Sequence, residues 1–149
     1  MGLNTTNVSV RLKMYENQQT GRVINHIKTE YGAEAEFLWP EKYPSYCVFR
    51  HGDNRKWFAL VATISSKSLG IEKAKLRNDE NKEYDGDKVE IINLKFDKNQ
   101  TYDFVETSDH IFSAYHMNKN NWITVVLDSG LSDEIIFELI RKSYLLTDK

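Results

Sequence analysis

The sequence is poor in cysteine and proline, and it has no long apolar run. A single cysteine, Cys47, cannot form an internal disulfide, which suits a reducing cytoplasm. No run of about 18 apolar residues is present, and the first fifteen residues lack the apolar segment of a secretory signal. We therefore expect a cytoplasmic protein with no membrane partner, in which Cys47 is a small buried hydrophobe rather than a nucleophile.

The sequence also lacks an excess of basic over acidic residues. The net charge is −2. Residues 1–75 carry 11 basic and 7 acidic residues, a net charge of +4, whereas residues 76–149 carry 9 and 15, a net charge of −6. A protein that binds duplex DNA usually has a strong basic footprint, so the composition argues against a general affinity for duplexes. The uneven distribution is nevertheless compatible with one basic face.

What is present fits one domain. A chain of 149 residues with 40% apolar and 28% charged residues is long enough to bury a core without disulfides or a structural metal. We assign residues 1–18 to an N-terminal arm of uncertain structure, where apolar residues alternate as in a strand but also fit a short amphipathic helix. Residues 19–149 are predicted to form a single domain.

Helical periodicity marks two segments. The first begins near residue 19 with Thr20 as its expected N-cap, and Gly32 is expected to end it in a left-handed turn. The second begins near residue 131 with Ser132 as its N-cap and acidic residues in its first turn. The apolar stripe of the first helix is Val23, Ile24, Ile27 and Tyr31. The inward face of the second is Ile136, Leu139, Ile140 and Ser143.

Strand patterns lie between these helices. Residues 46–51 and 57–64 predict a hairpin around the turn 52–56, where Gly52 and the Asx residues should supply the unusual torsions. Residues 89–96 are apolar on both faces, as a central strand requires, and residues 122–127 form a further strand. A rigid, extended connection with aromatic anchors is expected at 37–44, a polar surface excursion at 65–87, and a short helix near 97–105.

This order of elements implies an α+β fold. Helices separated by several short strands are typical of a two-layer sandwich, in which the helices pack on one face of a mainly antiparallel sheet.

One motif is specific enough to indicate a family. Residues 114–119 read Ala-Tyr-His-Met-Asn-Lys and are followed by Trp-Ile-Thr-Val at 122–125. With residues 48–50, 56–60 and 143–146, this stretch resembles the MmcQ/YjbR-like family over roughly residues 20–146. The resemblance implies a frataxin-like (CyaY-like) α+β sandwich and a proposed role in DNA binding through two wings. It implies no catalytic activity.

Two binding functions are consistent with the residues. In the first, basic and amide side chains of two loops contact DNA: Arg50, Arg55, Lys56, Asn118 and Lys119. In the second, the motif lines a pocket for a small molecule or a protein partner, formed by Tyr115, His116, Met117 and Trp122. The same motif residues could instead serve a purely structural role, packing and bonding to backbone.

Catalysis and metal binding have less support. His116 lies beside Tyr115, but no Ser or Cys nucleophile, paired carboxylate or phosphate-binding loop accompanies it, so we expect no enzyme and no catalytic residue. The four histidines lack close ligand spacing, so neither a metal nor another cofactor is predicted.

Overall fold

The computed structural model of the chain describes residues 18–69, 88–97, 99, 109–114, 117–118 and 121–148. The expectations for the arm before residue 18, for most of the polar excursion and for most of the short helix near 97–105 concern residues outside these ranges. Within them, no helix is both long and apolar enough to cross a membrane.

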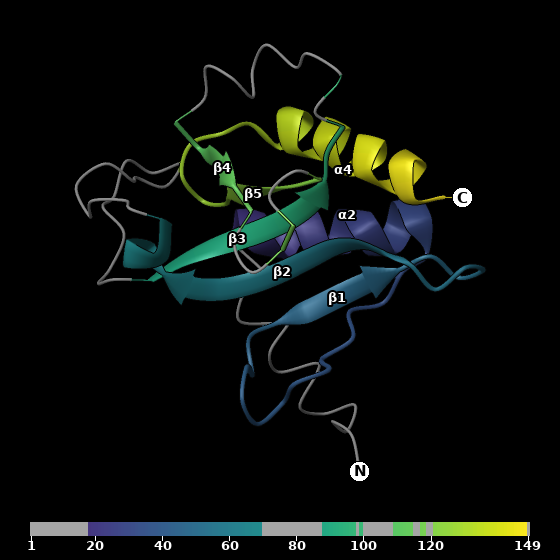
Figure 1. The fold of residues 1–149 in the computed structure, drawn as a ribbon, viewed down its shortest axis with the longest axis horizontal. Helices are drawn as coiled ribbons and strands as arrows, with labels where there is room; N and C mark the ends of the chain where they lie inside the picture. Colours follow the sequence, from purple (N-terminus) through teal and green to yellow (C-terminus); the bar gives the residue numbers. More distant parts are fainter. Residues whose placement is uncertain are drawn as a thin grey trace.

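The described residues form one five-stranded antiparallel sheet and two long helices (Figure 1). In chain order the elements are α2 (Gln19–Tyr31), β1 (Cys47–Arg50), β2 (Trp57–Ser65), the 3-10 turn η1 (Ser66–Leu69), β3 (Lys88–Lys95), β4 (Ile111–Ser113), β5 (Trp122–Val126) and α4 (Asp133–Thr147). The strand order is β1-β2-β3-β5-β4. The predicted α+β class and the central position of β3 are confirmed. Strand β4 was not predicted, because three residues are too few to show a period.

The two faces of the sheet are covered differently. Both helices pack on one face, where their apolar stripes meet residues such as Phe49, Phe58 and Ile92 in one core cluster. Burial of apolar surface at this interface is the main stabilising term of the fold. The opposite face carries a smaller cluster around Leu60 and Ile91, and aromatic side chains from the α2–β1 connection pack against it. This second face is therefore covered by side chains of loops rather than by a described α-helix.

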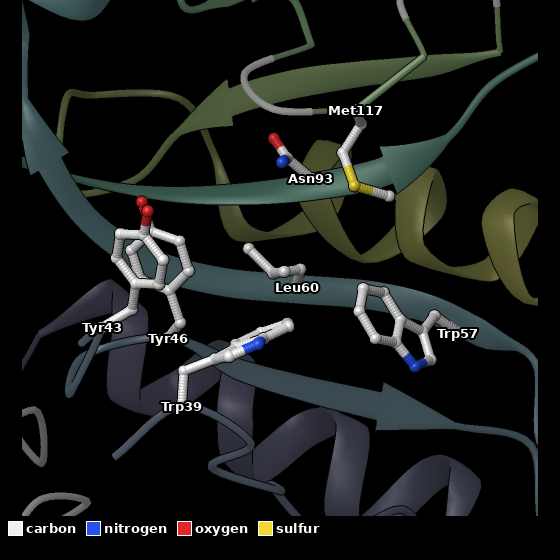
Figure 2. A pocket seen from close by; sticks show the side chains of 7 residues that line it. All are labelled: Trp39, Tyr43, Tyr46, Trp57, Leu60, Asn93 and Met117. Atoms are coloured by element: carbon white, nitrogen blue, oxygen red, sulfur yellow. The ribbon is translucent and has the colours of Figure 1, made fainter. Parts of the chain in front are cut away.

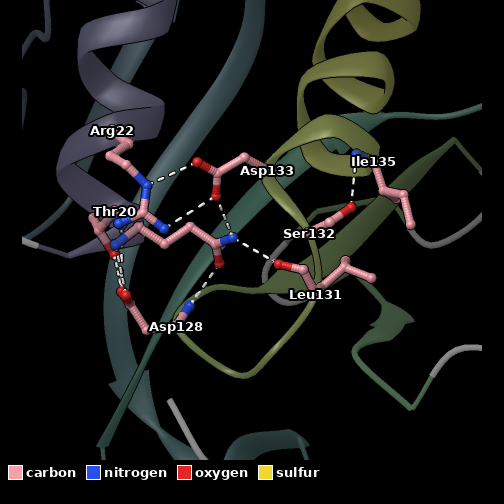
Figure 3. A network of polar contacts seen from close by, with 8 residues as sticks. Thr20, Arg22, Asp128, Leu131, Ser132, Asp133 and Ile135 are labelled. Carbon is pink, nitrogen blue, oxygen red and sulfur yellow. Dashed lines mark hydrogen bonds and ion pairs between the residues drawn. The ribbon is translucent and has the colours of Figure 1, made fainter. Parts of the chain in front are cut away.

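The start of α2 is capped from a distant part of the chain. Asp128 follows β5, and its carboxylate accepts hydrogen bonds from the backbone N–H groups of Gln19 (2.6 Å) and Thr20 (3.3 Å) and from the Thr20 hydroxyl (2.9 Å) (Figure 3). A carboxylate at this helix end satisfies amides that lack intrahelical partners and also interacts favourably with the helix dipole. The prediction that Thr20 is the N-cap is wrong. Gln18 holds that position, without a side-chain bond.

A buried glutamine extends this contact between the two helices. The amide of Gln19 donates to the Leu131 carbonyl (2.7 Å) and to the Asp133 carboxylate (2.8 Å), while its oxygen accepts from the Asp128 N–H (2.8 Å). Arg22 pairs with Asp133 through Nε at 2.7 Å, and this contact holds the pKa of Asp133 below its usual value (Figure 3). Ser132 caps α4 as predicted, accepting from the backbone N–H of Ile135.

A single hydroxyl fixes α4 to the sheet. Ser143 is fully buried, donates to the Phe58 carbonyl of β2 (2.6 Å) and accepts from the Lys95 N–H of β3 (2.8 Å). The β2–β3 pairing ends at Ala59 and Leu94, so this hydroxyl satisfies backbone groups just beyond the ladder. The helix thus binds β2 and β3 through one buried hydroxyl on a mostly apolar face.

The predicted β1–β2 hairpin is present, but its turn uses a different residue from those expected. Arg55 adopts the left-handed conformation (φ 63°), whereas Gly52 does not have a positive φ. The Asn54 side chain accepts from the Lys56 N–H (2.8 Å), and such an Asx contact stabilises the turn. A left-handed, non-glycine residue is costly unless its surroundings hold it, and Arg55 also pairs with Glu36.

Candidate ligand-binding pocket

A hollow of about 290 Å³ lies on the sheet face opposite the helices. Its walls are mostly aromatic, and Figure 2 shows Tyr43 and Tyr46 on one side, Trp57 on the other and Trp39 between them. The complete described lining is Trp39, Tyr43, Tyr46, Trp57, Leu60, Asn93 and Met117.

Two pairs of rings around the hollow meet at steep angles, and a third pair is stacked. The ring of Trp39 lies at 81° to that of Trp57, with 5.8 Å between centroids, and at 86° to that of Tyr46, with 6.3 Å between centroids. Tyr43 and Tyr46 are stacked, with centroids 4.6 Å apart and an angle of 20° between the rings. Because each ring packs against its neighbour, the rings restrict one another's rotation. The aromatic surfaces of the hollow are therefore largely pre-formed.

The connection between α2 and β1 supplies three of these four rings. The N–H of Tyr43 donates to the Trp39 carbonyl (2.9 Å), and the N–H of Tyr46 donates to the Tyr43 carbonyl (3.1 Å). These bonds form successive tight turns, so the segment is turned rather than extended as predicted from its prolines. Ser45 fixes the segment to β2, because its hydroxyl accepts from the Thr63 N–H (3.1 Å).

The floor of the pocket comes from the sheet. Leu60 of β2 lies opposite Asn93 of β3, and Asn93 lies opposite Thr124 of β5. The Thr124 hydroxyl donates to the Asn93 side-chain oxygen (2.5 Å), and both residues are buried. Asn93 and Thr124 are thus hydrogen-bonded to each other at the base of an apolar hollow. This bond fixes the orientation of the Asn93 amide.

Positive charge lies close to two of the rings. Lys42 Nζ is 5.4 Å from the ring centroid of Tyr43, and Arg50 Cζ is 6.0 Å from that of Trp57. Both distances are within the range of cation–π attraction. The aromatic walls are therefore already in contact with cations of this chain.

The cationic residues predicted to bind DNA are partly neutralised in the structure. Arg50 Nε is 3.3 Å from Glu36 Oε2, and an Arg55 guanidinium nitrogen is 3.4 Å from Glu36 Oε1. Lys56 is exposed at the end of the hairpin. One carboxylate thus contacts both arginines.

The second predicted loop is described only in part. Asn118 is exposed, and its carbonyl accepts from the N–H groups of Asn121 (3.1 Å) and Trp122 (3.0 Å), which closes a turn before β5. Lys119 lies outside the described residues, so Asn118 is the one predicted contact residue of this loop that the structure places.

Of the four motif residues predicted to line a pocket, the structure describes two, Met117 and Trp122. Met117 lines the hollow, with its side chain directed into it (Figure 2). Trp122 is not part of the lining, and Lys95 Nζ lies 5.5 Å from its ring centroid. Tyr115 and His116 lie outside the described residues.

Most of the pocket was missed from the sequence. Four aromatic residues stand close together between positions 37 and 46, and the only local signal was this density. Nothing local indicates that they turn back onto Trp57 and Leu60, because that depends on contacts between segments.

Two groups elsewhere in the sheet have shifted pKa values. Burial raises the pKa of the Cys47 thiol to about 12, which keeps it protonated and unreactive at neutral pH. Burial also raises the pKa of Glu90 to about 7, with a smaller contribution from Asp128, although a hydrogen bond from Thr63 (2.7 Å) opposes the shift. Neither group lines the hollow.

Comparison with known proteins places this fold among relatives. A family model described as YjbR matches residues 29–146. The chain is similar to the uncharacterized protein YyaQ of Bacillus subtilis, with 32% identity over 126 residues, which are 84% of this chain and 94% of that protein. A crystal structure of a Pseudomonas syringae protein shares 35% identity with a TM-score of 0.68, over 85% of this chain and 96% of that one. Deinococcus radiodurans DR2400, at 22% identity and a TM-score of 0.55 over 85% of this chain and 78% of that one, supports the fold alone.

Proposed function

The chain belongs to the YjbR family, and we propose that it is a binding protein that takes up a planar aromatic small molecule, neutral or anionic, in the hollow on the open sheet face. One observation carries the proposal. The ring of Trp39 stands nearly perpendicular to those of Trp57 and Tyr46 around a common apolar space. Ligand sites are commonly concave, mostly apolar and largely pre-formed, with a few polar groups that fix orientation.

Size limits the ligand. A volume of about 290 Å³ is at the lower end of the range of small-molecule sites, which is roughly 300–1,000 Å³. A compound with one or two fused rings fits such a space, and an aromatic ring prefers offset-stacked or edge-to-face contacts of the kind these walls offer. A fragment of this size is expected to bind with a Kd on the order of 0.1–1 mM.

Charge selects among such compounds. An aromatic cage without nearby cations suits an organic cation. Here Lys42 already lies over Tyr43, so a second cation would be repelled, whereas Arg50 beside Trp57 is paired with Glu36. An anionic substituent directed toward Lys42, which is exposed, would be attracted. The proposal therefore favours an aromatic carboxylate over a neutral ring, and a neutral ring over a quaternary ammonium ion.

Binding without chemical conversion is part of the proposal. The described lining holds no carboxylate, imidazole or thiol, and its only ionisable groups are two tyrosine hydroxyls. General acid–base catalysis most often uses histidine or a carboxylate, and the described lining offers neither. The cytoplasmic location expected from the lone cysteine remains part of the same proposal.

DNA binding is the second candidate. Its support is the position of Arg50, Arg55 and Lys56 at one end of the hairpin, with the side chain of Arg55 58% exposed. Contact of both arginines with Glu36 and the net charge of −2 weaken it. Electrophoretic mobility shifts with duplex and single-stranded DNA at low salt test this candidate. Retardation that is lost in R55A and K56A would favour it over the small-molecule proposal.

Isothermal titration calorimetry tests the small-molecule proposal. The probes are indole-3-acetate, indole and benzyltrimethylammonium, and the expected affinities decrease in that order. Trp57→Ala removes one wall of the hollow. It should lower the affinity for indole-3-acetate by about tenfold, which is the effect expected for the loss of one aromatic contact. Lys42→Met should remove the preference for the anion while leaving the affinity for indole unchanged.

A matched control is available on the other side of the molecule. Leu145 of α4 is an exposed apolar side chain outside the pocket lining, so Leu145→Ala should leave all three affinities unchanged. Thermal unfolding of each variant checks that the fold is intact. Equal binding of indole-3-acetate by wild type and W57A, or no binding of any probe at millimolar concentration, would contradict the proposal.

A further inference from the structure

Three potential metal ligands meet where the hairpin turn approaches the C-terminal end of α4. His51 follows β1, Asp53 lies in the turn, and Asp148 is the C-cap residue of α4. One ligand atom from each lies within 4.8 Å of the others. None of the three lines the aromatic hollow, so the cluster is separate from the proposed ligand site.

The imidazole of this cluster is buried and only half satisfied. The side chain of His51 is 1% exposed, and its Nε2 lies 2.7 Å from the Thr147 hydroxyl oxygen. The one hydrogen of that hydroxyl is directed to main-chain carbonyls of α4, the nearer being that of Ser143 at 2.8 Å. Thr147 must therefore accept from His51, which places the ring proton on Nε2.

In the neutral ring, the other nitrogen then carries a lone pair with no hydrogen-bond donor facing it. His51 Nδ1 has no hydrogen-bond partner, and it faces the carboxylate of Asp148, whose Oδ1 is 3.7 Å away. Asp53 presents a second carboxylate to the same point. A buried lone pair and two negative groups converge here, and a cation between them would satisfy all three.

We propose that His51 Nδ1, Asp53 and Asp148 bind one divalent transition-metal ion of the Zn²⁺ type. An imidazole nitrogen combined with carboxylate oxygens suits Zn²⁺ and its first-row neighbours, whereas Mg²⁺ and Ca²⁺ prefer oxygen ligands alone. Three protein ligands leave further positions for water. The C-terminal end of α4 adds partial negative charge from its last carbonyl groups, which also favours a cation.

The geometry needs only a small closure. Ligand atoms around a tetrahedral Zn²⁺ at about 2.0–2.2 Å from the metal lie roughly 3.4 Å apart. Asp53 and Asp148 are exposed and can rotate inward, whereas His51 is fixed. Its ring packs against Tyr144 (centroids 4.1 Å apart) and Phe58 (5.3 Å).

Hydrogen bonds around the cluster hold its parts in place. The bond from Nε2 to Thr147 orients the imidazole, as partners of the second ring nitrogen do in known metal sites. The Asn54 amide donates to the Thr147 carbonyl (3.0 Å) and so ties the hairpin turn to the end of the helix. The positions of the two carboxylates are thus linked through the fold.

Calorimetric titration of the full chain with Zn²⁺ tests the site, with Co²⁺ absorption as a second measure of coordination. Wild type should bind one Zn²⁺ at this site. Asp53→Asn and Asp148→Asn change exposed groups and should each weaken binding by about tenfold or more. Asp109→Asn is a matched control, because it makes the same change at an exposed carboxylate outside the cluster.

Nitrogen NMR of the histidine rings separates this site from metal held elsewhere on the chain. Zn²⁺ should shift the Nδ1 resonance of His51 in wild type and in D109N, and at the same concentration it should do so far less in D53N and D148N. Equal Zn²⁺ affinity in wild type, D53N and D148N would overturn the proposal. So would the absence of Zn²⁺ binding, or a His51 ring that is doubly protonated and indifferent to the metal.

Discussion

Replacing Glu90 by glutamine should alter how the stability of the fold depends on pH. Glu90 lies on β3, partly buried, and it accepts a hydrogen bond from the Thr63 hydroxyl (2.7 Å). Burial, with help from the charge of Asp128, raises its pKa from 4.5 to about 7. Glutamine keeps the shape and the acceptor oxygen but carries no charge at any pH.

The direction of the effect follows from the raised pKa. The folded protein holds the proton more tightly than the unfolded chain, so the contribution of Glu90 is complete below pH 4.5 and is lost as the pH rises through about 7. A shift from 4.5 to about 7 corresponds to about 3 kcal/mol. Between pH 5 and pH 8, the wild type should therefore lose about 2–3 kcal/mol of stability that the glutamine variant keeps.

Urea unfolding at pH 5 and pH 8 measures the difference. The free energy of unfolding that the wild type loses between pH 5 and pH 8, minus the loss in E90Q, gives the contribution of Glu90 apart from the other titrating groups. Glu41→Gln makes the same chemical change at an exposed position and should give no such difference. If wild type and E90Q lose the same free energy between the two pH values, Glu90 is not a buried acid with a raised pKa.

Other contacts of the fold lead to further predictions. Asp128→Asn removes the charge that caps α2 and should lower the free energy of unfolding by about 2 kcal/mol, hence Tm by roughly 4–8 °C, whereas D109N at an exposed site should change neither. Ser143→Ala leaves two buried backbone groups without their partner and should cost about 1–3 kcal/mol in urea unfolding, and an unchanged midpoint would refute that role. Cys47 should react with a thiol reagent only when urea unfolds the chain, and rapid reaction of the native protein would contradict its burial.

Local signals in the sequence were sufficient for the helices and the central strands. Gly32 ends α2 in the left-handed conformation (φ 66°), with its N–H bonded to the Lys28 carbonyl, and Ser132 caps α4. Each signal depends on residues within one or two turns of the chain. The family resemblance, now confirmed, gave the same fold class from a motif that spans few residues.

Contacts between distant segments could not be predicted in this way. The cap of α2 is Asp128, more than 100 positions from Thr20, so the sequence near Thr20 gave the wrong cap. The left-handed torsion of the hairpin falls on Arg55, whose side chain contacts Glu36. For the cap of α2, an interaction between elements overrides the preference of the local sequence.

The same limit applies to the sites. Residues 39–46 are rich in aromatics, but only the turns of that segment and its bond to β2 direct them over Leu60. His51 and Asp53 are neighbours in sequence, yet their third partner, Asp148, comes from the end of α4. A search for ligand spacing along the chain therefore cannot find this cluster.

The three tryptophans allow the most direct test of the proposed pocket. Trp39 and Trp57 form its walls, whereas Trp122 lies outside the lining. In a proton–nitrogen NMR titration with indole-3-acetate, the indole N–H signals of Trp39 and Trp57 should move together and saturate, while that of Trp122 stays in place. Equal movement of all three signals, or movement of Trp122 alone, would contradict the assignment of the ligand site to this aromatic hollow.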